Sequence, residues 1–197
     1  MGKCGVRNAA VVIGYFARIA PEKGLHLLCE AYRRLRQMPG VGTTRLRAGG
    51  YLGEAGRAYL EETRRDMAAW GLAEQFDYVG EPDRAGKIGF LRGLDIFSMP
   101  TTYREPKGLP VLEALACGVP FVEPAHGVFP ELAEATGGGV LVKPDDPQAL
   151  AEALARLVSD AALREELGRR GGEVVRRGFS AERMAEQTLE VFRRVLA

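Results

Sequence analysis

The amino-acid sequence predicts an α/β fold, a doubly wound parallel six-stranded sheet with extra C-terminal helices. Short apolar, β-rich runs alternate with amphipathic segments as far as residue 145, and from Asp146 onward every segment has helical periodicity. Strands interleaved with helices in this way are typical of a parallel sheet covered on both faces. We expect strands at 9–16, 43–51, 75–80, 95–101, 120–125 and 138–144, with helices at 21–38, 53–71, 84–94, 109–118 and 129–136.

The first helices are predicted from their spacing. After the apolar run "AAVVIGYF", helical spacing relates five side chains: Leu25, Leu28, Cys29, Tyr32 and Leu35. Pro39-Gly40 then stops the helix, and "TTRLRAGGY" is a strand that ends in glycines. The next helix carries one face made of Tyr59, Thr63, Met67 and Trp70.

The remaining elements are shorter. "QFDYVG" and "DIFSMPT" are strands on either side of a short helix, and Gly118 closes the helix that follows. "PFVEPA" and "GGVLVKP" are the last two strands, and they flank a helix at 129–136. In the helical tail, Ser159-Asp160 and Ser180 are suitable N-caps.

Length and composition limit the classes of protein. With 197 residues the chain suits one domain over 1–197, with a leader at 1–10 and closing helices at 146–197. A formal net charge of +1 provides no bulk attraction to nucleic acid or to an anionic membrane. No apolar run approaches the roughly 20 residues of a membrane span, and the N-terminus lacks the apolar stretch of a secretory signal.

Cysteines and histidines are few. The chain has three cysteines, with no CxxC pair, and this odd number favours a reducing cytoplasm over a disulfide framework. Its two histidines, His26 and His126, are far apart in sequence, which argues against a histidine-based metal site. We therefore expect a cytoplasmic protein.

Ligands of open α/β sheets bind at the carboxyl ends of the strands. The loops expected there are 16–24, 50–54, 79–84, 101–109 and 124–129. In the first, Arg18 and Lys23 flank a turn before a helix N-terminus, where two cations could hold a phosphate or diphosphate. A solvated loop with a Glu22–Lys23 surface pair accounts for the same residues equally well.

The segment "YREPKGLPVLEALACGVP" places Glu105 and Glu113 eight positions apart. Five other glutamate pairs have this spacing, so the context of the segment matters more. Glu105 follows a strand, Gly108 permits close backbone approach to a ligand, and Pro110 suits the first turn of a helix. Free amides near Gly108, Leu109, Val111 and Leu112 would form an anion site, with Glu113 one turn further as an acceptor for two sugar hydroxyls.

Two further strand ends carry weaker signals. "YVGEPDR" (78–84) and "PAHGVFPE" (124–131) each place a glycine beside a strand end, which ordinary turn chemistry explains. His126 suits a surface loop. Glu131 suits the first turn of a helix, where the helix dipole favours a carboxylate without any catalytic role.

Taken together, these segments resemble a known family. "GYFARIAPEKGLHLLCEAYRRL" resembles the opening of the C-terminal, donor-binding domain of GT-B-fold retaining glycosyltransferases of group 1, or family 4. "REPKGLPVLEALACGVPFV" resembles the paired-glutamate EX7E motif of that family, and "GVLVKPDDPQALAEALARLVSD" resembles the segment that closes its sheet. The resemblance extends from about Val11 to the end of the chain and implies a single nucleotide-sugar-binding, Rossmann-like domain.

The resemblance also implies roles for individual residues. Arg18 and Lys23 would bind the donor diphosphate, and Glu105 would contact the donor sugar near the reacting carbon. The amides of Gly108 and Leu109 would bind the same diphosphate. Glu113 would hold the ribose hydroxyls, and the loop of Val79, Gly80 and Glu81 would lie against the base. The implied activity is transfer of a hexosyl unit from a nucleoside diphosphate sugar, of UDP or GDP type, with retention of configuration and without metal or other cofactor.

The sequence departs from the family in two ways. The position two after the first glutamate is commonly aromatic, and here it is Lys107, which could alter the sugar pocket or add a cation near the phosphates. The N-terminal acceptor domain is absent, so the isolated chain is expected to be inactive and to need that domain in cis or in trans. A membrane-proximal acceptor is compatible with the resemblance, and the sugar, base and acceptor are left open.

The last helix carries an apolar stripe of Met184, Thr188, Val191, Phe192 and Val195. In the two-domain family the closing helix crosses back to the first domain, so the stripe could be exposed here and favour self-association. Packing on the domain's own core is the preferred interpretation.

Three other functions compete with glycosyl transfer. The same fold would suit a UDP-sugar epimerase domain, although the paired glutamates argue against it. A non-catalytic nucleotide-sugar-binding subunit belongs to a different class. A dinucleotide-binding dehydrogenase is disfavoured because "FARIAPEKG" replaces GxGxxG after the first strand.

Overall fold

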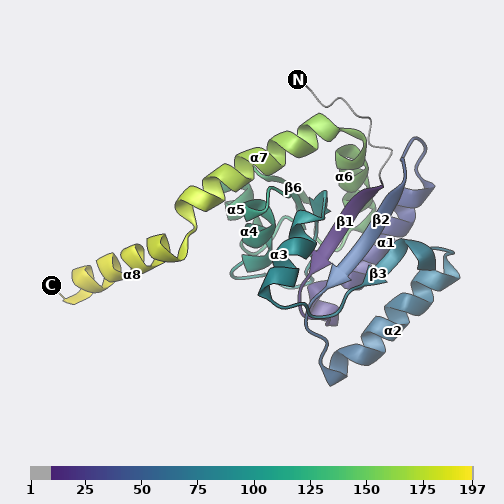
Figure 1. The fold of residues 1–197 in the computed structure, drawn as a ribbon, viewed down its shortest axis with the longest axis horizontal. Coiled ribbons are helices and arrows are strands. Elements are labelled where there is room, and N and C mark those ends of the chain that lie inside the picture. Colours follow the sequence, from purple (N-terminus) through teal and green to yellow (C-terminus); the bar gives the residue numbers. More distant parts are fainter. Residues whose placement is uncertain (1–9, 197) are drawn as a thin grey trace.

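The computed structural model describes residues 10–196 and contains one six-stranded parallel sheet in the order β3-β2-β1-β4-β5-β6 (Figure 1). This confirms the predicted fold class. The strands are β1 Val11–Phe16, β2 Thr44–Gly49, β3 Phe76–Tyr78, β4 Ile96–Phe97, β5 Phe121–Pro124 and β6 Gly139–Val142. Residues 1–9 of the predicted leader lie outside the described part of the chain.

The helices follow the predicted alternation. They are α1 Leu25–Gln37, α2 Glu54–Ala69, α3 Arg84–Arg92, α4 Leu109–Ala116, α5 Phe129–Thr136, α6 Pro147–Ser159, α7 Ala161–Gly178 and α8 Ala181–Leu196. The helix predicted from residue 21 is divided in two: Pro21–Lys23 form a 3-10 turn, and α1 begins after Gly24, whose φ is 76°. A left-handed residue cannot continue a right-handed helix.

The direction of winding reverses between β1 and β4. Successive strands run outward from β1 to β3 on one side of this point and from β4 to β6 on the other. Helix α1 packs on α6, whereas α7 packs on α4 and α5, so the sheet is covered by two helical layers. The reversal leaves a crevice at the carboxyl ends of the strands, the usual ligand position in this architecture.

The core lies on both faces of the central strands. Ile13, Tyr15, Leu46, Phe97 and Phe121 are completely buried, as expected for a parallel sheet between helices. All five apolar positions predicted on the first helix are also buried. The predicted caps of the tail are confirmed, since Asp160 accepts a hydrogen bond from the Leu163 amide and Ser180 accepts one from the Arg183 amide.

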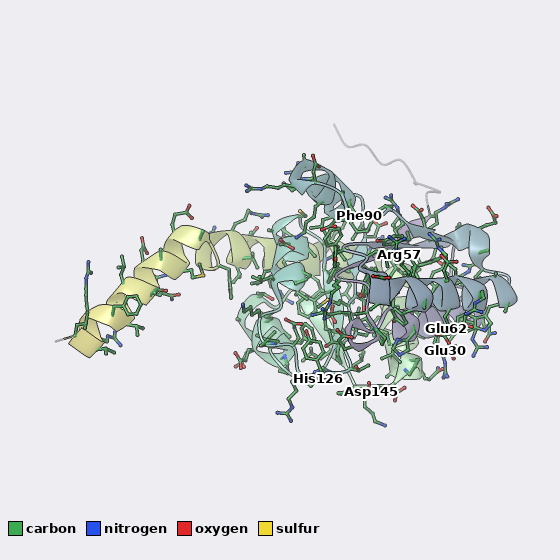
Figure 2. All side chains as sticks on the ribbon, turned by 90° about the horizontal axis from the view of Figure 1, so that it is seen from below. Glu30, Arg57, Glu62, Phe90, His126 and Asp145 are labelled. Atoms are coloured by element: carbon green, nitrogen blue, oxygen red, sulfur yellow. The ribbon has the colours of Figure 1, made fainter. Side chains whose placement is uncertain are left out.

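Helix α8 extends away from the rest of the fold (Figures 1 and 2), and its first turns border α4, where Met184 and Gln187 line a hollow with Leu109 and Leu112. Every residue of α8 is exposed, including Phe192 at 57%. The preferred interpretation, that its apolar stripe packs on the domain's own core, is therefore wrong. An amphipathic pattern shows which face is apolar, but it does not show what covers that face. None of the helices within residues 10–196 is both long and apolar enough to cross a membrane.

Candidate functional site

Lys23 and Glu105 come together although 82 positions separate them in the chain. The Lys23 ammonium lies 2.8 Å from Glu105 Oε2, and the two side chains are 17% and 8% exposed. The Tyr103 hydroxyl contacts both groups, accepting from Lys23 and donating to Glu105. The structure thus joins the loop after β1 to the loop after β4 through a largely buried ion pair.

The electrostatics of this pair keep both groups charged. Burial by itself raises the pKa of Glu105, but the hydrogen bonds from Lys23 and Tyr103 and the lysine charge outweigh it, and the pKa is held below the usual value. Burial by itself lowers the pKa of Lys23. The hydrogen bonds with Glu105 and Tyr103 outweigh burial, so the pKa of Lys23 lies above its usual value. Glu105 is therefore an ionised carboxylate at neutral pH.

Arg18, the other cation predicted in the loop after β1, lies at the surface. Arg18 pairs with Glu22, and both side chains are exposed. The alternative surface pair of Glu22 with Lys23 is therefore wrong, because these two residues have different partners. The Glu22 carbonyl also accepts a hydrogen bond of 3.1 Å from the Thr102 amide, which holds the two loops against each other.

Helix α4 begins beside Glu105. Gly108 precedes the helix with a φ of 63°, and its amide lies 3.4 Å from Glu105 Oε1. Leu109 is the first helical residue, so its amide precedes the first intrahelical hydrogen bond. The amides of Val111 and Leu112, which were expected to be free, donate to the Gly108 carbonyl instead. Of the four amides expected to be free, those of Val111 and Leu112 are therefore engaged within the helix, and that of Gly108 points at Glu105.

Glu113 lies one turn into α4 and faces α3. Its carboxylate is 2.6 Å from the Lys87 ammonium, which also lies 5.0 Å from the centre of the Phe16 ring. The Glu113 side chain is 42% exposed, so its oxygens remain accessible to a ligand. The two motif glutamates thus have separate lysine partners, one from the loop after β1 and one from α3.

Two adjoining hollows follow the strand ends and share Arg18 and Tyr51. One has a volume of ≈ 340 Å³ and is lined by Phe16, Ala17, Arg18, Gly50, Tyr51, Glu81, Pro82, Lys87 and Pro110. The other, of ≈ 350 Å³, lies over the first turns after β1 and β2. Together they suit a ligand of nucleotide size.

The loop after β3 is only partly available to this space. Glu81 lines the first hollow. The backbone of its neighbours extends the sheet instead: the Val79 amide donates to the Ala48 carbonyl, and the Gly80 carbonyl accepts from the Gly50 amide. Val79 and Gly80 therefore shape the wall of the site through their backbone.

Lys107 and a small hollow beside Thr101 lie next to the residues described above. The Lys107 side chain is exposed and forms no ion pair within residues 10–196, while its amide lies 3.3 Å from Glu105 Oε1.

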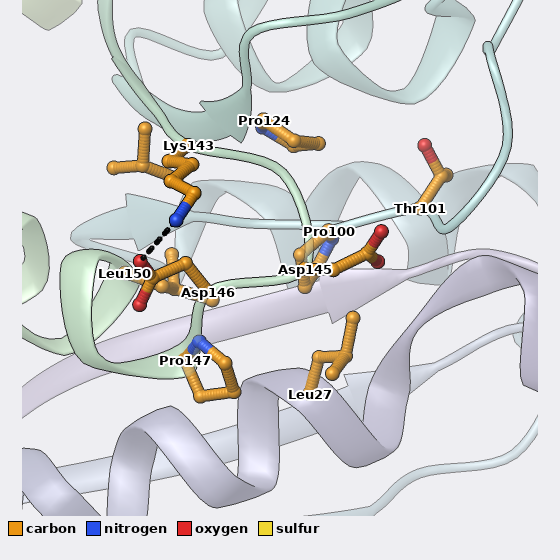
Figure 3. A pocket seen from close by; sticks show the side chains of 10 residues that line it. Leu27, Pro100, Thr101, Pro124, Lys143, Asp145, Asp146, Pro147 and Leu150 are labelled. Carbon is orange, nitrogen blue, oxygen red and sulfur yellow. Dashed lines mark ion pairs between the residues drawn. The ribbon is translucent and has the colours of Figure 1, made fainter.

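The tight hollow of Figure 3, bordered by Thr101, Pro124 and Asp145, has a volume of only ≈ 10 Å³, room for about one water molecule. It cannot hold a sugar nucleotide.

His126 is not the plain surface residue that its loop position suggested. Its Nε2 lies 2.9 Å from the Thr101 carbonyl, beside the Glu105 loop, and the ring is half-buried (Figure 2). Glu131 does occupy the first turn of α5, as predicted.

Sequence reasoning did not assign roles to Tyr51, Lys87 or Tyr103. Tyr51 ends the strand predicted at 43–51, and Tyr103 lies two residues after the strand predicted at 95–101, so their position at strand ends was a usable signal. Lys87 lies within a short helix and had none. Across residues 10–196, no group of three or more histidine, cysteine or acidic side chains is arranged to hold a metal ion.

Comparison with known proteins agrees with this arrangement. The family model described as glycosyl transferases group 1 matches residues 3–174. A GDP-mannose-dependent monoacylated alpha-(1-6)-phosphatidylinositol monomannoside mannosyltransferase of Corynebacterium glutamicum is 31% identical over 96% of this chain, which covers 49% of that protein.

Solved structures show the same fold. The C-terminal domain of a group 1 family glycosyl transferase, LpcC of Francisella tularensis, aligns with a TM-score of 0.77 and 26% identity over 87% of both chains. HepE of Anabaena in complex with UDP aligns with a TM-score of 0.82 and 23% identity over 93% of this chain and 48% of that one.

The chain spans about half the length of the mannosyltransferase and of HepE. It covers most of the solved C-terminal domain, and the family model extends over the sheet and both motif loops. The chain therefore belongs to the group 1 glycosyltransferases and has the GT-B type of α/β fold.

Proposed function

We propose that this chain is the donor-binding half of a retaining glycosyltransferase that transfers a hexosyl unit from a nucleoside diphosphate sugar. The observation that carries the proposal is the Lys23–Glu105 pair, set beside the start of α4 and next to the hollows at the strand ends. There the ionised carboxylate and its lysine lie beside a helix N-terminus, and Arg18 lines both hollows. The HepE complex with UDP and the GDP-mannose-dependent relative support a donor of UDP or GDP type.

In this proposal the chain acts by electrostatic stabilisation of the leaving group. As the bond between the sugar carbon and the diphosphate oxygen breaks, negative charge develops on the departing nucleoside diphosphate. Arg18 and Lys23 would offset that charge, and the amides of Gly108 and Leu109 would donate to the phosphate oxygens. No metal or other cofactor is required for this scheme.

The two glutamates would divide the rest of the donor between them. Glu105, ionised and fixed by Lys23 and Tyr103, would contact the donor sugar. Glu113 would accept hydrogen bonds from the ribose hydroxyls, and Lys87, its present partner, would then border the nucleoside. Glu81, with the backbone of Val79 and Gly80, would lie against the base.

The acceptor would bind to a separate N-terminal domain, supplied in cis or in trans, so this chain alone would bind donor without rapid transfer. The exposed stripe of α8 is available for that domain or, in the isolated chain, for self-association. The odd number of cysteines supports a cytoplasmic location, and a membrane-proximal acceptor is compatible with the relative that acts on a phosphatidylinositol mannoside.

Calorimetric titration with UDP, GDP and ADP, each in EDTA, tests the binding function. We expect one of them to bind, and Arg18→Ala, Lys23→Ala and Glu113→Ala each to weaken binding about tenfold, because each removes one charge-assisted contact. Arg183→Ala, on the exposed α8, is the matched control and should leave the affinity unchanged. Parent-like binding by all three site variants would contradict the site.

A non-catalytic donor-binding subunit is the second candidate, because the contacts proposed for the donor would bind it whether or not transfer follows. Mixing the chain with a separately produced N-terminal half of a relative distinguishes the two. Restored transfer that depends on Glu105 supports the enzyme, and donor binding without transfer supports the subunit.

A further inference from the structure

Pairing between β4 and β5 stops where the chain turns toward Glu105. Phe97 and Phe121 are the paired residues of these strands, with the Phe97 amide donating to the Pro120 carbonyl. Beyond this pair, hydrogen bonds that involve side chains take the place of the backbone hydrogen bonds between the two strands. The Ser98 hydroxyl donates to the Val122 carbonyl at 2.7 Å, and the Met99 amide donates to Glu123 Oε1 at 2.7 Å.

Glu123 is completely buried, which is rare for a glutamate. Its Oε2 has no hydrogen-bond partner among the residues that the structure describes. Burial raises the pKa of Glu123 well above the usual value, and the negative charge of Glu105 raises it further, while the Met99 amide opposes both. Burial therefore favours the uncharged form of the carboxyl, and its Oε1 serves the fold as a hydrogen-bond acceptor.

The segment after Glu123 contacts the same loop at two more points. His126 Nε2 lies 2.9 Å from the Thr101 carbonyl, and since a carbonyl only accepts, Nε2 carries the proton. The Val128 amide donates to the Glu105 carbonyl at 2.9 Å. Gly127 allows the approach, because a Cβ there would lie 2.6 Å from the Glu105 backbone. Residues 123–128 thus support the whole path from Met99 to Glu105.

We propose that Glu123 is a positioning residue for Glu105: through Met99 it sets where the 99–105 loop leaves the sheet, and hence where the Glu105 carboxylate meets the donor sugar. The effect on the donor sugar rests on the proposed function, whereas the effect on the 99–105 loop does not. A conventional ladder bond from Met99 would continue β4 straight along β5. The Glu123 side chain instead lets the two strands diverge while the Met99 amide stays paired.

Two variants isolate the acceptor oxygen. Glu123→Gln keeps an acceptor at the same reach and remains neutral, whereas Glu123→Met keeps the approximate volume and removes the acceptor. Glu105→Gln shows how far the affinity for the sugar nucleotide falls when the proposed contact between the Glu105 carboxylate and the donor sugar is lost. Leu154→Ala, a buried residue of α6, is the control for general loss of stability.

The first readout needs no ligand. In ¹H–¹⁵N spectra of the full chain, Glu123→Met should shift or broaden the amides of Met99 to Lys107, while Glu123→Gln and Leu154→Ala leave them close to the parent positions. Parent-like amides in Glu123→Met would overturn the proposal.

The second readout compares UDP with UDP-glucose and GDP with GDP-mannose by calorimetry. Glu123→Met and Glu105→Gln should both raise the Kd of the sugar nucleotide about tenfold or more, as for one lost hydrogen bond to a charged group, with the Kd of the bare nucleotide changed less than about twofold. Glu123→Gln should restore the parent values. Equal weakening for nucleotide and sugar nucleotide would overturn the positioning role. If the parent binds none of the four, the proposed function fails, and the spectra alone decide the role of Glu123 in the loop.

Discussion

Breaking the Lys23–Glu105 pair should destabilise the fold and make its stability depend differently on pH. In Lys23→Met the long apolar stem is retained and the ammonium is lost. Glu105, only 8% exposed, would then keep the Tyr103 hydroxyl and two long contacts to backbone amides. An ionised carboxylate left in such a site is costly, because its main compensating charge is gone.

The magnitude follows from the separation of the two groups. At an effective dielectric constant of about 20, unit charges 2.8 Å apart attract by about 6 kcal/mol. Desolvation cancels several kcal/mol per ion, so the net coupling should be about 2 kcal/mol, typical of a hydrogen bond to a charged group. The Lys23–Glu105 ion pair therefore contributes a modest share of the free energy of unfolding.

A double-mutant cycle with Lys23→Met, Glu105→Gln and the pair of substitutions together measures this coupling by urea unfolding. Because the folded pKa of Glu105 lies below its ordinary value of 4.5, its contribution is present above that pH and is lost as pH falls through the folded pKa. The gap between parent and Lys23→Met should therefore narrow below about pH 5. A coupling under about 0.5 kcal/mol at pH 7, the range of exposed pairs, would refute the reasoning.

Three further results are expected. Arg18→Ala should change stability by less than about 0.5 kcal/mol by urea unfolding, since its pair is exposed, yet weaken nucleoside diphosphate binding. Gly108→Ala should cost about 2–4 kcal/mol, because its new Cβ would lie 2.6 Å from Leu132 Cδ1, whereas Gly40→Ala, with a similar φ and open space, should cost only about 1 kcal/mol. In the isolated chain, Phe192→Asp should abolish concentration-dependent association in sedimentation experiments and leave urea stability unchanged; a monomeric parent would contradict this.

The fold was predictable because its periodicity is local. Six apolar runs separated by amphipathic helices are sufficient to indicate a parallel sheet. The buried face of the first helix was located correctly, and on the second helix Thr63 and Met67 are buried whereas Tyr59 and Trp70 are half-buried. The end of β4 was not predictable. The sequence of the run 95–101 does not mark where pairing with β5 stops at Phe97, and only the structure of the partner strand shows that the Glu123 side chain accepts from the Met99 amide.

The site was predictable as a set of loops and not as a set of contacts. Strand ends indicated Lys23 and Glu105 separately, but sequence spacing says nothing about which loops face each other across a sheet. Lys87 was missed because a lysine in a short amphipathic helix resembles any solvated residue. Its partner Glu113 shows that the helix after β3 also borders the site.

The exposed helix α8 has a consequence for the proposed assembly with an N-terminal domain. Every residue of this 16-residue helix is exposed, so little tertiary packing offsets the entropy of ordering it. Covering α8 and fixing it as a helix should thus be one coupled transition, with part of the association free energy spent on ordering. A rise in the far-ultraviolet helical signal on mixing would then report assembly before any sugar is transferred.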